Sequence, residues 1–380
     1  MEQFEYYFPT KVHFGKEQVS RLPGLIRTYA TKILLVYGQN SILQNGIFDM
    51  ITAMLRQNGI SYVSYQGIKS NPQIVDVNKA AELGRKFGAE LVLAVGGGSV
   101  IDSAKLISVA IPQEIDAWDF MTGKATPRKA IPLINILTLA ATGSEMNNIA
   151  VISNHQENKK QPLRHPLLSP KHSFLNPEFT FSVNRKYTAY GITDIIAHAL
   201  EAYFGSGSAP LSDKFIFSII REMMEIAHPL LNHLQDYELR ARMMYAATNA
   251  LNGLTLQGKK AGDWGVHALG HILSLLYDTP HGASLSIMYP AWMHCKTDAI
   301  RTPLIRLGKE IFDDTEPLSI IEKFSTFFVS IDSPVRLADA GISVNEISKI
   351  RQTMLENKVN GWVHNISVED IDCILNYCKF

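Results

Sequence analysis

Short apolar runs of strand length alternate with helical patterns over residues 1–184 of this 380-residue chain. The clearest apolar runs are Lys32–Tyr37, Ser61–Tyr65, Glu90–Val95 and Ile131–Leu139. Helix-like stretches lie between them, at Gly46–Gln57, Val75–Phe87 and Ser99–Ala110. Strands that alternate with helices are typical of a mostly parallel sheet covered by helices. This half of the chain is therefore predicted to form an α/β fold.

After residue 184 the strand-like runs disappear, and long helix-forming stretches take their place. They include Tyr187–Phe204, Ser212–Leu231, Glu238–Leu254, Trp264–Leu276 and Val368–Tyr377. One hydrophobic core rarely grows beyond about 250–300 residues, so a chain of this length is expected to form two domains. We predict an α/β domain over residues 1–184 and an all-α domain over residues 185–380.

Charge and cysteine content narrow the functional classes. Lys plus Arg and Asp plus Glu both number 36, so nothing in the balance favours nucleic acid or an anionic membrane as a partner. The first residues lack the pattern of a signal peptide, and no apolar run is long enough for a membrane span. The three cysteines, Cys295, Cys373 and Cys378, include no Cys-x-x-Cys pair and predict no disulfide framework. We expect a soluble cytoplasmic protein.

A glycine-rich turn, Gly96-Gly97-Gly98-Ser99, follows one predicted strand and opens a helix. Glycines let the backbone approach a ligand closely, and a helix N-terminus offers N–H groups to a pyrophosphate. Ser99 is expected to cap the helix or to donate to phosphate, and Ser99-Val-Ile-Asp102 resembles a capping box. The alternative is a well-capped connection with no ligand, and the residues alone leave both open.

Two further polar turns follow predicted strands. After the first strand come Gly38, Gln39, Asn40 and Ser41. A carboxylate there often holds the adenosine 2′-hydroxyl of NAD. None is present, which favours NADP(H) over NAD(H), although no adjacent Arg is available to pair with a 2′-phosphate.

The other turn carries Thr138, Thr142 and Ser144. Ligands of open α/β sheets gather at the carboxyl ends of strands, so these hydroxyls are candidates to bind phosphate or the nicotinamide amide. A turn that is merely capped by Ser and Thr is the alternative.

The second half of the chain holds a candidate metal site. Asp194 and His198 are four residues apart on a predicted helix, as are His267 and His271, and His281 follows on the next segment. Residues with this spacing share a helix face, and carboxylate and imidazole are ligands that Zn²⁺ and Fe²⁺ accept. Each pair alone is explained as well by an ion pair or a buried histidine. The spacing does not decide which of His267, His271 and His281 would bind.

These motifs together resemble the iron-dependent (group III) alcohol dehydrogenase family, nearly from end to end. The resemblance is carried by Phe8–Gly15, Gly96–Lys105, Thr142–Glu145, Asp194-x-x-x-His198, His267-x-x-x-His271 and His281-Gly282. Asp263-Trp264 and Tyr37-Gly38 are most similar to the branch of NADPH-linked butanol dehydrogenases and broad aldehyde reductases. That branch often has further glycines where this chain has Gln39-Asn40, which weakens the preference for NADP(H).

The resemblance implies a dehydroquinate synthase-like architecture. A Rossmann-like dinucleotide-binding domain would span residues 1–184 and an all-helical metal-binding domain residues 185–380, with the site in the cleft and a homodimer as the assembly. The implied metal ligands are Asp194, His198, His267 and His281. By the same resemblance, His271 would point into the site without binding metal, and Lys160 would lie near the cofactor.

The sequence thus predicts a metal-dependent oxidoreductase that moves hydride between NAD(P)(H) and a primary alcohol or aldehyde, such as butanol or butanal. The metal, Fe²⁺ or Zn²⁺, would act as a Lewis acid, and His271 would relay the proton. The alternatives are a polyol dehydrogenase of the glycerol type, a lyase of the dehydroquinate synthase type, and a regulatory protein that binds metal or nucleotide without turnover.

Overall fold

The computed structural model describes residues 1–379, and the chain separates into two compact units. We call one the sheet unit; it comprises Tyr7–Val183 and Gln235–Met244. The other, the helical unit, comprises Met1–Tyr6, Asn184–Leu234 and the residues from Tyr245 onward.

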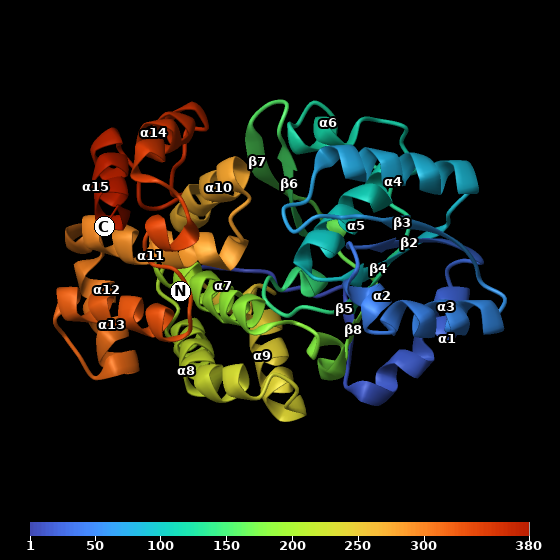
Figure 1. Cartoon of the computed structure of the whole chain (residues 1–380), viewed down its shortest axis with the longest axis horizontal. Coiled ribbons are helices and arrows are strands. Elements are labelled where there is room, and N and C mark those ends of the chain that lie inside the picture. Colours follow the sequence, from blue (N-terminus) through green and yellow to red (C-terminus); the bar gives the residue numbers. More distant parts are fainter. Residues whose placement is uncertain (380) are drawn as a thin grey trace. The chain divides into compact units, whose positions relative to one another are not determined.

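The sheet unit contains a six-stranded parallel sheet in the order β1-β8-β5-β4-β2-β3 (Figure 1). Its strands are β1 (Lys11–Phe14), β2 (Lys32–Tyr37), β3 (Ser61–Gln66), β4 (Leu91–Gly96), β5 (Leu133–Leu137) and β8 (His172–Leu175). An antiparallel hairpin joins β6 (Ile149–Asn154) and β7 (Lys159–Arg164). The helices are α1 (Leu22–Arg27), α2 (Ser41–Gln44), α3 (Ile47–Gln57), α4 (Ile74–Phe87), α5 (Gly98–Ala110) and α6 (Ala117–Met121). The predicted parallel α/β fold is confirmed.

Both faces of the central strands are buried, which explains their nearly continuous apolar character. On one face, Ile33, Leu93 and Ile136 belong to a single core with residues of α1 and α3. Successive side chains of a strand point to opposite faces. Leu34 accordingly lies on the other face, close to Gly84 of α4. Helix α5 packs beside α4 and contacts β4.

Some strands and boundaries differ from the sequence predictions. β1, β8 and the β6–β7 hairpin were not predicted, because β1 and β8 have only four residues each and β7 (Lys159–Arg164) is largely polar. The strand predicted at Ile131–Leu139 is confined to Leu133–Leu137. The helix predicted at Glu238–Leu254 ends at Ala250 and is followed by a short 3-10 helix.

The remaining elements are helices. They are α7 (Arg185–Tyr203), α8 (Pro210–Asn232), α9 (Tyr237–Ala250), α10 (Gly265–Tyr277), α11 (His281–Cys295), α12 (Thr297–Phe312), α13 (Pro317–Ser330), α14 (Ile347–Glu356) and α15 (Val368–Cys378). Helix α7 is buried without a break from Thr188 to Tyr203 and packs against α8 and α11. A helix buried on all sides must satisfy any polar side chain it carries within the protein.

The prediction that the cysteines form no disulfide framework is wrong. Cys295, at the end of α11, and Cys373, in α15, form a disulfide whose Cα atoms are 6.0 Å apart. The two residues are separated by 78 positions, so no local spacing links them, and only the packing of α11 against α15 brings them together. Cys378 is buried and is the free cysteine among the described residues.

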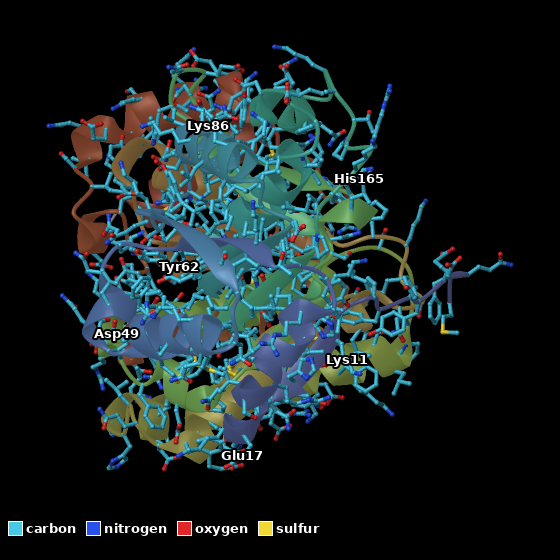
Figure 2. All side chains as sticks on the ribbon, turned by 90° about the vertical axis from the view of Figure 1, so that its right-hand side faces the viewer. Lys11, Glu17, Asp49, Tyr62, Lys86 and His165 are labelled. Atoms are coloured by element: carbon cyan, nitrogen blue, oxygen red, sulfur yellow. A yellow bond between two sulfur atoms is a disulfide. The ribbon has the colours of Figure 1, made fainter. Side chains whose placement is uncertain are left out.

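Charged side chains of both signs lie on the exposed surface of the sheet unit. Figure 2 shows Lys11, Glu17, Asp49 and Lys86 there. Within residues 1–379, no helix has both the length and the apolar character needed to cross a lipid bilayer.

Candidate functional site

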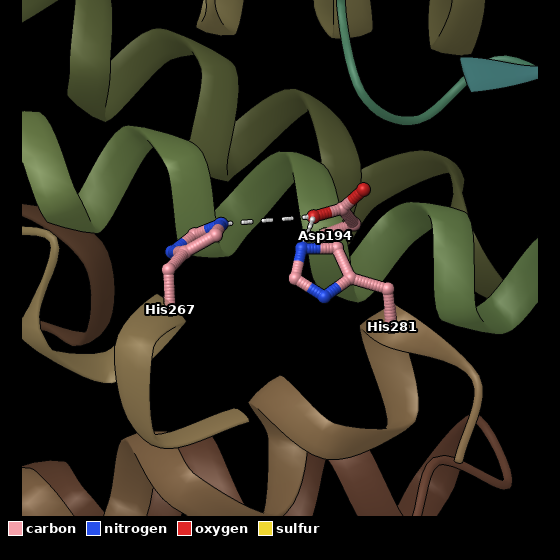
Figure 3. A group of neighbouring side chains, drawn as sticks. All are labelled: Asp194, His267 and His281. Carbon is pink, nitrogen blue, oxygen red and sulfur yellow. Dashed lines mark ion pairs between the residues drawn. The ribbon is translucent and has the colours of Figure 1, made fainter. Parts of the chain in front are cut away.

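Three side chains of the helical unit converge on one point (Figure 3). Asp194 of α7, His267 of α10 and His281 of α11 each offer one ligand atom, and these atoms lie within 4.8 Å of one another. Oδ1 of Asp194 is 3.7 Å from Nε2 of His281 and 4.0 Å from Nε2 of His267. His198, one turn after Asp194, is outside this mutual group, but its Nδ1 lies 3.5 Å from the same Oδ1.

These separations fit ligands that share an ion. They are too long for good hydrogen bonds. Two ligand atoms that each lie about 2.1 Å from one ion at a tetrahedral angle are about 3.4 Å apart. Nδ1 of His198 is buried, and burial lowers the pKa of His198 well below its usual value. A neutral imidazole with an available nitrogen is what a divalent metal requires, so the donor set fits the metal that the motifs implied.

Local packing explains how the three helices meet. Asp194 and His198 face the same way because they are one turn apart on α7. His281 is the first residue of α11, and Gly282 follows it. A Cβ at Gly282 would collide with the carbonyl oxygen of Tyr190 in α7. The absence of a side chain at Gly282 therefore allows α11 to approach α7 closely enough for His281 to reach Asp194.

Glu201 is a site residue to which the sequence analysis gave no role. Its Oε1 accepts a 2.8 Å hydrogen bond from Nδ1 of His267 and a 3.0 Å bond from the backbone N–H of the same residue. An acceptor oxygen at the far nitrogen fixes the tautomer and directs Nε2 toward the metal position. The signal was present, since Glu201 follows Asp194 by two helical turns on the same face. Burial and the neighbouring Asp263 raise the pKa of Glu201 to about 8.

Asp263 is a second residue whose structural role the sequence does not show. Its buried carboxylate accepts hydrogen bonds from the backbone N–H groups of Val363, at 2.9 Å, and His364, at 2.6 Å. Its own backbone N–H donates to the carbonyl of Glu201 at 3.0 Å. The loop that opens α10 is thereby fastened to a segment some 100 residues later in the chain. No local pattern could reveal that pairing.

His271 lies beside the cluster, one turn after His267 on α10. Its ring centre is 5.3 Å from that of His281 and 6.4 Å from that of His267. Trp264, which precedes α10 and has a positive φ of 64°, places its ring 5.4 Å from that of His267.

The three predicted nucleotide-binding turns end adjacent strands of the sheet unit. β4 pairs in parallel with β2 on one side and with β5 on the other, so their carboxyl ends share one edge. In the sheet, β2 lies between β3 and β4. The chain forms β3 on one side of β2 and then crosses over to form β4 on the other side. This is a topological switch point, where open α/β sheets bind ligands. The turn residues Gly38–Ser41, Gly97–Ser99 and Thr138–Ser144 all lie there.

The predicted capping box at Ser99 is wrong. Helix α5 begins at Gly98 with Gly97 as its N-cap, and no described side chain caps it. Ser99 instead donates its hydroxyl to the carbonyl of Ser70, and Asp102 accepts a hydrogen bond from Ser144. An N-terminus without a side-chain cap suits an anionic ligand.

The remaining predicted cofactor residues are placed as follows. Lys160 of β7 donates a 2.8 Å hydrogen bond to Oδ1 of Asn71, in the β3–α4 connection that also contains the Ser70 partner of Ser99. Gln66 donates to the backbone carbonyl of Gln39 at 2.7 Å and to Oδ1 of Asn40 at 3.3 Å. The structure therefore gathers these segments at one edge of the sheet unit.

Known proteins share both units. The family model for iron-containing alcohol dehydrogenase matches residues 9–177, and the C-terminal model of the Fe-containing alcohol dehydrogenase family matches residues 188–378. A probable NADH-dependent butanol dehydrogenase 1 of Bacillus subtilis is 37% identical over 99% of both chains. The NADPH-dependent aldehyde reductase YqhD of Escherichia coli is 31% identical over 97% of both. The crystal structure of NADH-dependent butanol dehydrogenase A from Thermotoga maritima has a TM-score of 0.96 and 36% identity, covering 100% of this chain and 99% of that one.

The chain therefore belongs to the iron-containing alcohol dehydrogenase family. It is an NAD(P)-linked oxidoreductase of alcohols and aldehydes that uses a divalent metal, as its motifs predicted.

Proposed function

We propose that this protein interconverts a primary aliphatic alcohol, such as butanol, with its aldehyde, at a metal held by Asp194, His198, His267 and His281. The observation that supports this most directly is the convergence of one carboxylate and three imidazoles at the separations of ligands that share an ion. We also propose that residues 1–184 form the dinucleotide-binding domain and residues 185–380 the metal-binding domain.

In the proposed reaction, different side chains of the protein have different roles. When bound, the metal supplies a Lewis acid for the substrate oxygen and the nicotinamide carries the hydride. Asp194 and the imidazoles hold the ion, while Glu201 fixes the ring of His267. His271 relays the proton, giving it to the oxygen when an aldehyde is reduced and accepting it when an alcohol is oxidised.

We propose that the nucleotide is bound by the three turns at the carboxyl edge of the sheet. The residues are Gly38, Gln39, Asn40, Ser41, Gly97, Gly98, Ser99, Asp102, Thr138, Thr142, Ser144 and Lys160. The turn after β2 has no carboxylate to repel a 2′-phosphate, which supports use of NADP(H) in preference to NAD(H). The names of relatives divide between NADH and NADPH, so the ratio of kcat/KM for the two cofactors is the deciding measurement.

The test of the proposed function begins with chelated protein reloaded with Fe²⁺ or Zn²⁺. Oxidation of NADPH and NADH is then followed with butanal, and reduction of the oxidised cofactors with butanol and glycerol. Metal-restored turnover of butanal supports the proposal. Turnover of glycerol alone would favour a polyol dehydrogenase, and bound metal and cofactor without turnover would indicate a regulatory role.

We also propose that the protein is a homodimer and acts in the cytoplasm. The dimer comes from the family resemblance, and the cytoplasmic location comes from the low number of cysteines. Light scattering of the purified protein would test the first, and fractionation of the source cells would test the second.

A further inference from the structure

A lysine is fully buried in the helix that follows the glycine-rich turn. Lys105 of α5 has no exposed surface. Its Nζ donates three hydrogen bonds, to Oγ of Ser144 at 2.8 Å, Oδ1 of Asn147 at 2.8 Å and the carbonyl of Ile149 at 2.7 Å. An ammonium group has three donors, so the lysine is fully satisfied. All three acceptors lie between the end of β5 and the start of β6.

Asp102 anchors the same connection one helical turn earlier. Its carboxylate accepts hydrogen bonds from the hydroxyl of Ser144 and, at 2.9 Å, from the backbone N–H of Val151. The Ser144 hydroxyl therefore donates to Asp102 and accepts from Lys105. Because the hydroxyl donates its one proton to Asp102, Ser144 links α5 to the β5–β6 connection.

The β5–β6 connection lies directly against the glycine-rich turn. A Cβ at Gly97 would come within 3.0 Å of Leu139, and one at Gly98 would collide with Thr142. The glycines are thus required for this close contact. Any movement of the connection would change the spacing between the start of α5 and the hydroxyl of Thr142.

We propose that Lys105, together with Asp102, is a positioning residue for nucleotide binding. The pair fixes the β5–β6 connection against the start of α5, so that the helix N-terminus and the hydroxyls of Thr138 and Thr142 present one preformed surface to the cofactor. Ser144 contributes to the cofactor site through this bridge, because its one proton is already donated to Asp102. The inference rests on the proposed function, because it assumes that these turns bind NAD(P)(H).

The charge state of Lys105 is consistent with this role. Burial lowers the pKa of Lys105 to about 8, and the carboxylates of Asp102 and Glu145 oppose the shift. The ammonium form, with its three donors, therefore predominates at neutral pH.

The test replaces Lys105 with methionine, which has a similar length and no donor. The matched control is Lys259→Met in the helical unit, since Lys259 is also buried and pairs with Asp213 at 2.6 Å. Dissociation constants for NADPH and NADH are measured by fluorescence titration of the metal-loaded proteins. Circular dichroism and metal analysis establish that each variant is folded and loaded.

Lys105→Met is expected to raise the cofactor dissociation constant about tenfold or more, with kcat at saturating cofactor changed much less. Lys259→Met is expected to lower thermal stability while leaving cofactor affinity within about twofold of the parent. If Lys105→Met does not fold, Asn147→Ala removes one acceptor of the same bridge and should weaken cofactor binding in the same direction.

Unchanged cofactor affinity in folded Lys105→Met or Asn147→Ala, accompanied by a lower melting temperature, would overturn the inference and leave Lys105 a purely structural residue. Equal losses of affinity in the Lys105 and Lys259 variants would overturn it too. A parent protein that binds neither cofactor would instead overturn the proposed function, on which the inference depends.

Discussion

The two ring nitrogens of His267 have different roles. One makes the hydrogen bond that orients the ring, and the other faces the proposed metal position. Nδ1 donates to Glu201, and Nε2 faces Asp194. Both partners come from α7, so a single buried helix supplies a proposed ligand and the group that orients another. This arrangement makes Glu201 important for metal affinity even though it does not touch the metal position.

We predict that Glu201→Ala weakens metal binding by about 10–100-fold, because the ring of His267 loses the acceptor that fixes its tautomer. Glu201→Gln keeps an acceptor oxygen and should lose less. Competition with a coloured chelator measures the affinity directly. Asp213→Asn is the control, since Asp213 is a buried carboxylate that pairs with Lys259 instead of a histidine. Equal losses in the Glu201 and Asp213 variants would contradict the prediction.

His271 offers a separate test of proton transfer. We predict that His271→Ala lowers kcat by about 10²–10⁴-fold with metal content unchanged, because general acid–base catalysis is lost while the proposed ligands remain. Steady-state kinetics across the neutral pH range, with metal analysis of the same samples, checks this. An unaltered kcat and pH profile would remove His271 from the mechanism.

A buried histidine pair in the sheet makes stability depend on pH. Nε2 of His13 lies 2.9 Å from Nδ1 of His172, whose Nε2 lies 3.0 Å from the hydroxyl of Tyr29. Burial, the neighbouring His172, and then Arg21 and Lys11 lower the pKa of His13 to about 4, and the pKa of His172 is lowered as well. As the pH falls, these two histidines therefore bind protons at a higher pH in the unfolded chain than in the folded protein.

The pair's contribution is complete above the ordinary histidine pKa and is lost as the pH falls toward 4. We predict that His13→Gln reduces the acid-dependent loss of unfolding free energy by about 3 kcal/mol at most. Urea unfolding at pH 7 and pH 4.5 measures the free energy of unfolding of the parent and the variant. The contribution of the carboxylates, which both proteins share, cancels in the comparison. Parallel losses in the two proteins would contradict it.

At the scale of elements, α11 is held at both ends. Its first residue, His281, reaches Asp194 of α7, and its last, Cys295, is bonded to Cys373 of α15. A crosslink stabilises mainly by restricting the unfolded chain, and the effect grows with the enclosed loop. For the 78 positions enclosed here, the loop-entropy relation gives an upper value of about 4.5 kcal/mol.

We predict that reduction of this disulfide lowers the free energy of unfolding by up to about 4.5 kcal/mol without releasing the metal. Guanidinium unfolding with and without reductant measures the change, and Cys295→Ser should match the reduced parent. A parent protein whose stability does not respond to reductant would show that the bond contributes nothing in solution.

Local pattern predicted most elements, and the failures have identifiable causes. The strands β2, β4 and β5 are buried on both faces, so their apolar runs were clear. β1 and β8 are too short, and β7 too polar, for such a signal. Asp194 and His198 were recognised by their helical spacing, whereas Glu201, on the same face, was passed over because its partner lies on another helix.

At the scale of the whole molecule, the proposed metal and nucleotide sites belong to different units. A ligand that binds only the folded form slows local opening of the part that holds it. We predict that Zn²⁺, added to chelated protein, slows amide exchange in α7, α10 and α11. NADPH should slow exchange at the start of α5 and in the turns after β2 and β5.

Hydrogen–deuterium exchange with mass spectrometry would resolve these segments. The two ligands serve as controls for each other, since each should protect a different set of peptides. If Zn²⁺ protected the sheet peptides as strongly as the helical ones, the prediction would be contradicted.

The sequence by itself determined the parallel α/β half, the helical half, the family and the residue types of the metal site, because strand and helix periodicity and i, i+4 spacing are local properties. Only the tertiary structure decided that Glu201 orients His267, that Cys295 reaches Cys373 and that Lys105 braces the β5–β6 connection. These contacts join residues far apart in the chain. They depend on close helix packing, such as the contact between Gly282 and Tyr190, which no local pattern encodes.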